Sequence, residues 1–216
     1  MTQSQLYLIS PLDVSGAFPE RLERALAAGP VAAFQFRVKG VDQHEAARLA
    51  GPLLDICRAR EVAFIVNDSI ALAKRLAADG VHLGQTDGSV REAREALGRE
   101  AQIGVTCHAS RHLAMEAGEA GADYVAFGSF FPSPTKASDH RAELDLLTWW
   151  QALMEIPCVA IGGITPDNCG PLIAAGADFL AVSAAVWGDD EVAAVRAFVA
   201  RLDQSGSSFQ ATEESP

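Results

Sequence analysis

The sequence predicts an α/β protein and, within that class, a (β/α)8 TIM barrel. Short apolar runs alternate with amphipathic, alanine-rich segments eight times along the 216 residues, without a break in composition. The runs are nearly continuous, which is typical of parallel strands buried on both faces. Eight units of similar length in about 200 residues favour a closed barrel, at the lower end of its size range, over an open doubly wound sheet.

The first half of the chain contains four of these units. We expect, in order, strand 6–10, helix 19–28, strand 32–38, helix 42–60, strand 63–66, helix 70–78, a strand within 79–87 and helix 90–97. The strands are apolar runs that end in polar residues, and the first helix carries Ala, Leu and Arg at helical spacing. Gly29 closes the first helix, and Asp42 and Ser69 are candidate caps of the second and third.

The second half repeats the alternation. We expect, in order, strand 102–106, helix 110–120, strand 124–127, helix 143–154, strand 157–161, helix 166–175, strand 179–182 and helix 189–202. Ser110 is a candidate cap, and Trp149 and Trp150 are expected to pack their helix against a neighbour. Residues 204–216 are rich in Ser, Gln and Glu, which predicts a disordered tail after a single domain over residues 1–203.

Composition and charge restrict the function and the compartment. The net charge of −11 argues against nucleic acid as a partner, and a hydrophobic content of 49% is ample for a core. No apolar run approaches the ~20 residues that span a bilayer, and residues 1–5 lack the basic start of a signal peptide. Four cysteines without a C-x-x-C pair predict reduced thiols. We therefore expect a cytoplasmic protein without a membrane partner, and a homo-oligomer is compatible with the sequence.

Polar residues gather where the expected strands end. In a barrel the active site lies at the carboxyl ends of the strands. The residues concerned are Gln35, Arg37, Lys39, Asn67, Asp68, Asp87, Thr106, His108, Ser133, Thr135, Lys136, Gly163 and Ser183. This coincidence is the main indication of an enzyme. Taken singly, Asn67, Asp68 and Asp87 could equally cap helices, and Gln35, Arg37 and Lys39 could belong to a polar edge strand.

Residues 128–136, Gly-Ser-Phe-Phe-Pro-Ser-Pro-Thr-Lys, predict a stiff loop after the sixth strand. Two prolines remove backbone donors and exclude a regular helix or a central strand. Ser133, Thr135 and Lys136 then offer two hydroxyls and an ammonium, which suit phosphate oxygens. The alternative is an ordinary solvent-exposed loop.

The polar residues form two groups that suit different phosphates. Basic residues on the second strand and in the loop would share a site with Asp68 and Asp87, which makes sense if Mg²⁺ bridges carboxylates and a diphosphate. Gly163 and Ser183 suit a single phosphate monoester, because loops after strands seven and eight often bind phosphate in barrels. A diphosphate and a monophosphate together suggest a transferase that releases pyrophosphate.

At these positions the chain resembles the thiamine-phosphate synthase family, from about residue 6 to residue 202. The matching segments are Gln-Phe-Arg-Val-Lys (35–39), Asn-Asp (67–68), Asp-Gly-Val-His-Leu-Gly-Gln-Thr-Asp (79–87), Pro-Ser-Pro-Thr-Lys (132–136), Ala-Ile-Gly-Gly-Ile (160–164) and Ala-Val-Ser-Ala (181–184). The resemblance implies that a hydroxymethylpyrimidine diphosphate and a thiazole phosphate are joined to thiamine phosphate, with release of pyrophosphate. It also implies a dissociative mechanism in which pyrophosphate leaves first.

The resemblance implies a role for each matching residue. The residues implied to bind the pyrimidine substrate and its diphosphate are Gln35, Arg37, Lys39, Asn67, Thr106 and Lys136. Asp68 and Asp87 are implied to bind Mg²⁺. The residues implied to bind the thiazole phosphate are Ser133, Pro134, Thr135, Gly163, Val182 and Ser183. Arg37, Lys39 and Lys136 are the expected catalytic residues, because they neutralise the leaving group. The family usually has Ser at Thr106, Pro at Ser129 and Thr at Ser133, which leaves room for a paralogue.

Two rivals share the barrel. A thiazole tautomerase would need a general acid or base, for which His82 or His108 could serve, but not the diphosphate residues. A non-catalytic barrel that binds thiazole phosphate or thiamine phosphate would not need to keep both acids and Lys136. Retention of the whole diphosphate set favours the synthase. For His82, a core or indirect role is as good an interpretation as direct catalysis.

Overall fold

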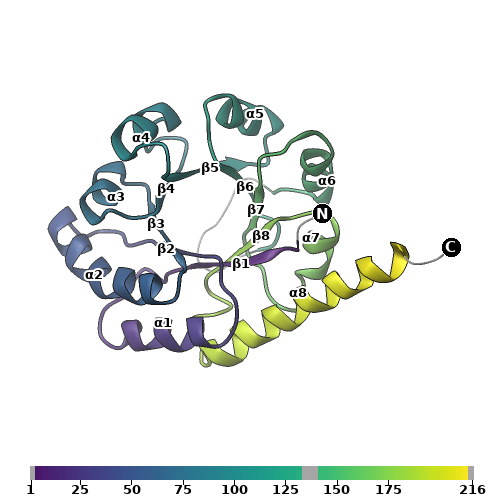
Figure 1. Cartoon of the computed structure of the whole chain (residues 1–216), viewed down its shortest axis with the longest axis horizontal. Coiled ribbons are helices and arrows are strands. Elements are labelled where there is room, and N and C mark those ends of the chain that lie inside the picture. The colour runs from purple at the N-terminus through teal and green to yellow at the C-terminus, as the bar shows by residue number, and fades with distance from the viewer. Residues whose placement is uncertain (1–2, 133–140, 214–216) are drawn as a thin grey trace.

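The computed structural model describes residues 3–132 and 141–213, the last nine of these (205–213) by their backbone alone. Eight parallel strands close into a barrel in chain order, and helices surround it (Figure 1). The strands are β1 (Gln5–Ile9), β2 (Ala33–Phe36), β3 (Ala63–Asn67), β4 (Gly80–Leu83), β5 (Gln102–His108), β6 (Tyr124–Phe127), β7 (Cys158–Ile161) and β8 (Phe179–Val182). The predicted (β/α)8 barrel is confirmed.

One helix follows each strand in the described part of the chain. The helices are α1 (Phe18–Ala27), α2 (Gln43–Ala59), α3 (Ile70–Leu76), α4 (Val90–Leu97), α5 (Arg111–Glu119), α6 (Leu144–Leu153), α7 (Gly170–Ala174) and α8 (Glu191–Glu213). The three predicted caps are confirmed, because the side chains of Asp42, Ser69 and Ser110 each accept a backbone N–H of the first helical turn. None of the described helices is long and apolar enough to span a membrane.

Several predicted boundaries were wrong. Helix α7 begins at Gly170 rather than residue 166, because the Asn168 side chain accepts the Thr165 N–H and donates to the Gly163 carbonyl, and so holds a turn there. Helix α8 continues to Glu213, past the end predicted at Leu202, and its last turns extend beyond the ring of helices (Figure 1). The apolar periodicity stops at Leu202, but adding residues to an existing helix needs no core contact. The division into a domain over 1–203 and a tail over 204–216 stays a prediction.

Alternate residues of each strand face two different cores. In β1, Leu6 and Leu8 pack toward the helices, whereas Tyr7 and Ile9 face the barrel interior. The outer core is rich in aromatic side chains. Trp150 of α6, for example, is fully buried, and its ring centroid lies 5.5 Å from that of Phe127 in β6, as the sequence predicted for this helix. Burial of these outer faces fixes the register of the strands and therefore the positions of their carboxyl ends.

Three aspartates brace the amino-terminal end of the barrel. Each directly precedes an even-numbered strand. Its Oδ2 atom accepts a backbone N–H at the start of the preceding odd-numbered strand. The pairs are Asp79 with Phe64 (2.7 Å), Asp123 with Ile103 (2.7 Å) and Asp178 with Cys158 (2.8 Å). The backbone N–H of each aspartate donates to the carbonyl of the same partner residue. We call these three residues the braces.

We expect Asp123→Ala to lower the free energy of unfolding by about 1–3 kcal/mol, because a buried N–H loses its acceptor. The variant also removes the partner of Arg94, whose Nη2 lies 2.6 Å from Asp123 Oδ2. Urea unfolding measures the loss. Asp145→Ala is the control, because Asp145 is 74% exposed in its ion pair with Arg111 and should change stability by less than about 0.5 kcal/mol. Equal losses in the two variants would contradict the bracing role.

Candidate active site

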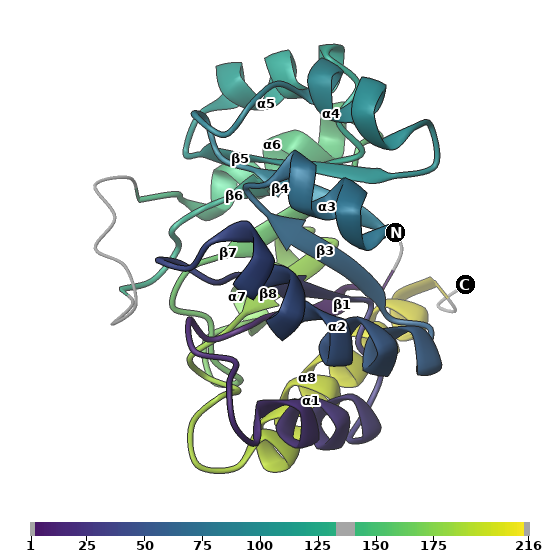
Figure 2. The same cartoon turned by 90° about the vertical axis from the view of Figure 1, so that its left-hand side faces the viewer.

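The carboxyl ends of the strands open on one side of the barrel, at the left of Figure 2. The described residues predicted for the site lie in the last residues of β2, β3, β5 and β8 or in the loops that follow β2, β3, β4, β7 and β8. Ser133, Pro134, Thr135 and Lys136 lie outside the described residues. The described ends of their loop meet at the site, because the Ala142 N–H donates to the Ser129 carbonyl at 3.0 Å.

An acidic pair and a lysine meet where β2, β3 and β4 end. Lys39 Nζ lies 2.6 Å from Asp68 Oδ2. Burial raises the pKa of Asp87, and the charge of Asp68 and a hydrogen bond between the two carboxylates raise it further. The Gly84 N–H donates to Asp87 Oδ2 at 3.0 Å and orients it. Two adjacent carboxylates form a site that a divalent cation could occupy.

The alternative that these acids cap helices is wrong. The N-caps of α3 and α4 are Ser69 and Ser89. Asp68 instead adopts a left-handed conformation, with φ of 66°, and its N–H donates to the His82 carbonyl of β4 at 2.8 Å. A non-glycine residue in this region is uncommon. Here it places the Asp68 carboxylate beside Asp87, which follows the next strand.

Arg37 follows the end of β2 and is held by its backbone. Its N–H donates to Ser10 Oγ at 2.9 Å, and the same hydroxyl donates to the Arg37 carbonyl at 3.1 Å. The Arg37 side chain is half-buried, whereas that of Lys39 is 54% exposed. Gln35, two residues before Arg37, points into the barrel and is 4% exposed. The edge-strand alternative is wrong, because β2 pairs with both β1 and β3.

A row of polar side chains crosses the barrel interior. The bonds are Gln35 Nε2 to Tyr7 OH (3.0 Å), Tyr7 OH to Tyr124 OH (2.9 Å), Tyr124 OH to His82 Nδ1 (3.1 Å) and His82 Nε2 to Thr106 Oγ1 (2.8 Å). We call these five residues the interior row. Gly104 makes room for it, because a Cβ there would collide with the Tyr124 ring. Tyr7 and Tyr124 are functional candidates that the sequence reasoning missed.

The two histidines predicted as alternatives sit differently. Burial lowers the pKa of His82 to about 4, so its ring is neutral near pH 7 and inside the row. This environment fits the indirect role better than that of a general acid. His108 ends β5 with φ of 51°, and its carbonyl accepts the Gly128 N–H at 3.0 Å. Cys107 beside it is buried, and burial raises the pKa of its thiol to about 12, which does not suit a nucleophile.

The region predicted for a monophosphate lies at the ends of β7 and β8. These strands are neighbours, and Val182 and Ser183 follow Ala181, the register partner of Ile161. Gly163 has φ of 63°, and a Cβ there would collide with the Pro132 carbonyl. The Phe131 N–H also donates to the Gly162 carbonyl at 3.0 Å. The loop after β6 therefore packs on the glycine turn after β7, so the two loops predicted to bind thiazole phosphate are in contact.

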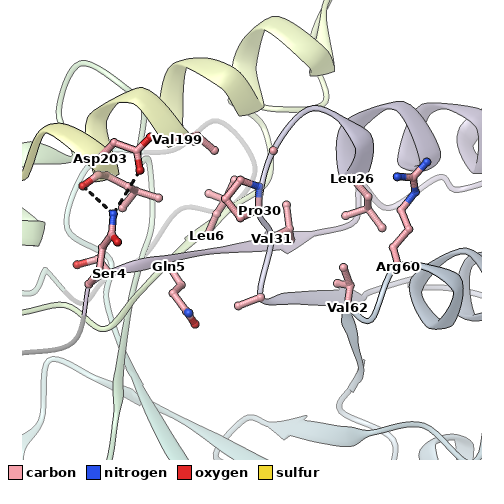
Figure 3. A pocket seen from close by; sticks show the side chains of 14 residues that line it. Ser4, Gln5, Leu6, Leu26, Pro30, Val31, Arg60, Val62, Val199 and Asp203 are labelled. Carbon is pink, nitrogen blue, oxygen red and sulfur yellow. Dashed lines mark hydrogen bonds between the residues drawn. The ribbon is translucent and has the colours of Figure 1, made fainter. Parts of the chain in front are cut away.

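A cavity of about 420 Å³ lies at the opposite, amino-terminal end (Figure 3). Side chains that precede or begin the strands, such as Ser4 and Val62, line it together with Leu26 of α1 and Val199 of α8. Among the described residues predicted for the site, none lines this cavity. It is separate from the candidate active site.

A model of the family described as thiamine monophosphate synthase matches residues 6–186. The chain belongs to this family. The thiamine-phosphate synthase of Erythrobacter litoralis (strain HTCC2594) is 75% identical over 203 residues, which cover 92% of this chain and 95% of the relative. That of Rhodospirillum centenum (strain ATCC 51521 / SW) is 53% identical over 188 residues, which cover 87% and 91%.

Solved structures agree. Thiamine phosphate pyrophosphorylase from Pyrococcus furiosus superposes with a TM-score of 0.83 at 31% identity, and the match covers 94% of this chain and 97% of that one. Membership of the thiamine monophosphate synthase family confirms the resemblance found in the six segments and makes the protein a transferase. These comparisons give no support to the tautomerase or to the non-catalytic barrel.

Proposed function

We propose that the protein condenses 4-amino-2-methyl-5-(diphosphooxymethyl)pyrimidine with 4-methyl-5-(2-phosphooxyethyl)thiazole to thiamine phosphate and pyrophosphate, in the cytoplasm. The observation that carries the proposal is the meeting of Lys39 with Asp68 and Asp87 at adjoining strand ends, in a chain of this family. A lysine ammonium beside two carboxylates suits a diphosphate that is bound together with a metal ion. The metal ion would offset the repulsion between the carboxylates and the phosphates.

Mg²⁺ fits the acidic pair as its proposed cofactor. The ion prefers oxygen ligands and commonly binds through one or two carboxylates together with substrate phosphates. Burial raises the pKa of Asp87 and the negative charge of Asp68 raises it further, and a bound dication would relieve this repulsion. When bound, Mg²⁺ would neutralise charge on the diphosphate leaving group.

In the proposed reaction the bond between the pyrimidine methylene carbon and the diphosphate oxygen breaks, and its electron pair leaves with pyrophosphate. The thiazole nitrogen then gives its lone pair to the methylene carbon, and the new C–N bond forms. Arg37, Lys39 and Lys136 stabilise the negative charge that develops on the leaving group, which is the main contribution of the protein.

Binding places the two substrates side by side. Gln35, Asn67 and Thr106 are proposed to orient the pyrimidine, and all three belong to strands that line the mouth of the barrel. The thiazole phosphate is assigned to the contacting loops after β6 and β7 and to the end of β8, through Ser133, Pro134, Thr135, Gly163, Val182 and Ser183. Backbone N–H groups free of a Cβ, such as that of Gly163, allow close approach of phosphate.

An assay with both substrates and Mg²⁺ tests the proposal. We expect thiamine phosphate and pyrophosphate to appear in equal amounts, to stop when a chelator is added and to resume with excess Mg²⁺. A parallel reaction with a non-aromatic thiazole carboxylate phosphate tests the tautomerase. Aromatisation of that compound without pyrophosphate release, or tight binding of thiazole phosphate without any product, would overturn the proposal.

A further inference from the structure

The interior row links two residues on strands that are not neighbours in the barrel. Gln35 belongs to β2 and Thr106 to β5, with β3 and β4 between them. Tyr7 and Tyr124, which join them, come from β1 and β6. With His82 of β4, the row therefore connects side chains from five strands, and it depends on closure of the barrel.

Water cannot replace a missing partner along the middle of the row. Tyr7, Tyr124 and His82 are all at least nine-tenths buried, and in the described part of the chain every buried side-chain nitrogen or oxygen has a hydrogen-bond partner. A buried hydroxyl proton without an acceptor would cost roughly 1–3 kcal/mol. The donors and acceptors must therefore alternate consistently along the row.

Consistent alternation gives the row a direction. The Gln35 amide donates to Tyr7, so the single Tyr7 proton must go to Tyr124. The Tyr124 proton then goes to His82 Nδ1, which must be unprotonated, and the proton of the imidazole sits on Nε2 and points at Thr106 Oγ1. The Thr106 hydroxyl thus accepts from the protein, and its own proton is left for another acceptor.

We propose that Tyr7, Tyr124 and His82 are positioning residues that fix the Thr106 hydroxyl as a hydrogen-bond donor toward the pyrimidine substrate and couple it to the amide orientation of Gln35. The identity of the substrate rests on the proposed function, but the direction of the row rests on protein atoms alone. Gln35 keeps its carbonyl oxygen available, so the mouth of the barrel offers an acceptor from β2 and a donor from β5. This pair matches a ring that carries an amino group and an unprotonated ring nitrogen.

The tautomer of His82 tests the direction without any substrate. In histidine-¹⁵N-labelled, ligand-free protein at pH 8, we expect the His82 resonances, identified by their loss in His82→Gln, to show a proton on Nε2. Gln35→Glu places a carboxylate, which only accepts, at the start of the row, and it should move the proton to Nδ1. A proton on Nδ1 in the unaltered protein, or no change of tautomer in Gln35→Glu, would overturn the proposal.

Kinetics test the coupling to the substrate. Tyr7→Phe interrupts the row far from Thr106, and we expect about a tenfold lower kcat/KM for the pyrimidine diphosphate, the effect of one hydrogen bond, with an unchanged KM for the thiazole phosphate. Ser4→Ala is the matched control, because it removes a buried hydrogen bond to the Ala177 carbonyl at the amino-terminal end. Equal effects of the two variants on both substrates would leave only a structural role and refute the coupling. If the unaltered protein makes no thiamine phosphate, the proposed function is refuted. The tautomer of His82 still tests the direction of the hydrogen bonds in the interior row.

Discussion

Asp87→Asn is expected to lower turnover by about two orders of magnitude and to abolish the response of the protein to Mg²⁺, because an uncharged amide is a weak ligand for a hard dication. The amide oxygen can still accept the Gly84 N–H that holds Asp87, so the loop should stay in place. Asp68→Asn should act in the same way and should also release Lys39. These are the largest catalytic effects that we expect from single carboxylate substitutions.

In the metal-free protein, the same Asp87→Asn substitution should not lower the stability of the fold. A carboxyl group whose folded pKa is raised is favourable when protonated, and this contribution disappears as the pH rises through the folded pKa. The raised pKa of Asp87 therefore predicts that Asp87→Asn leaves the metal-free protein as stable as the original at pH 8, or makes it more stable. The stability of the unaltered protein should correspondingly improve as the pH falls through that folded pKa.

Thermal melts with pyrophosphate, in Mg²⁺ or in chelator, measure both effects. Mg²⁺ should raise the melting temperature of the unaltered protein and of Asp145→Asn, an exposed acid on α6 that serves as the control. It should leave Asp87→Asn unchanged. Normal Mg²⁺ dependence of turnover and melting in both Asp68→Asn and Asp87→Asn would refute the metal site.

Gly104→Ala should be among the most destabilising single-methyl changes in the barrel. The new Cβ would collide with the Tyr124 ring, which is held by Tyr7 and His82 and cannot move without breaking the interior row. Overpacking of this kind costs about 1–3 kcal/mol and sometimes more. We expect a lower urea midpoint and a loss of activity that exceeds the loss of folded protein at the assay temperature.

Gly51→Ala is the matched control for this change. Gly51 lies inside α2, and a Cβ there would meet no atom within 4 Å. Alanine in a helix interior is favoured over glycine by about 0.5–1 kcal/mol, but Pro52 follows directly and disfavours helical backbone at a residue with a Cβ, so this variant should change stability little. If both variants changed the urea midpoint by the same amount, the packing of Tyr124 on Gly104 would not matter.

The sequence predicts the barrel well because its signals are local and repeated. Apolar runs, helix caps such as Asp42, and glycines between elements each act within a few residues, and eight repeats leave few alternatives. Closure then places all strand ends together, so the contact of Asp68 with Asp87 follows from their places after β3 and β4. Helix ends were less predictable, as at Gly170, where a side chain hydrogen bond from Asn168 decides the start.

The interior row could not be predicted in the same way. Strands that are apolar on both faces have no alternation to tell which residues point inward, so Tyr7 and Tyr124 look like ordinary core residues. Their contact joins positions 117 residues apart and depends on the absence of a side chain at Gly104. One signal was available: a buried phenol needs a polar partner, and the chain contains only these two tyrosines.

The braces have a consequence for how the molecule tolerates change. Asp79, Asp123 and Asp178 tie the strands together at one end of the barrel, and the residues proposed for catalysis follow the strands at the other. Distant sites that share no partners have additive mutational free energies. Adaptation of this chain to a warmer or colder setting can therefore proceed through substitutions around the braces, while the arrangement of charges that governs the chemistry stays the same.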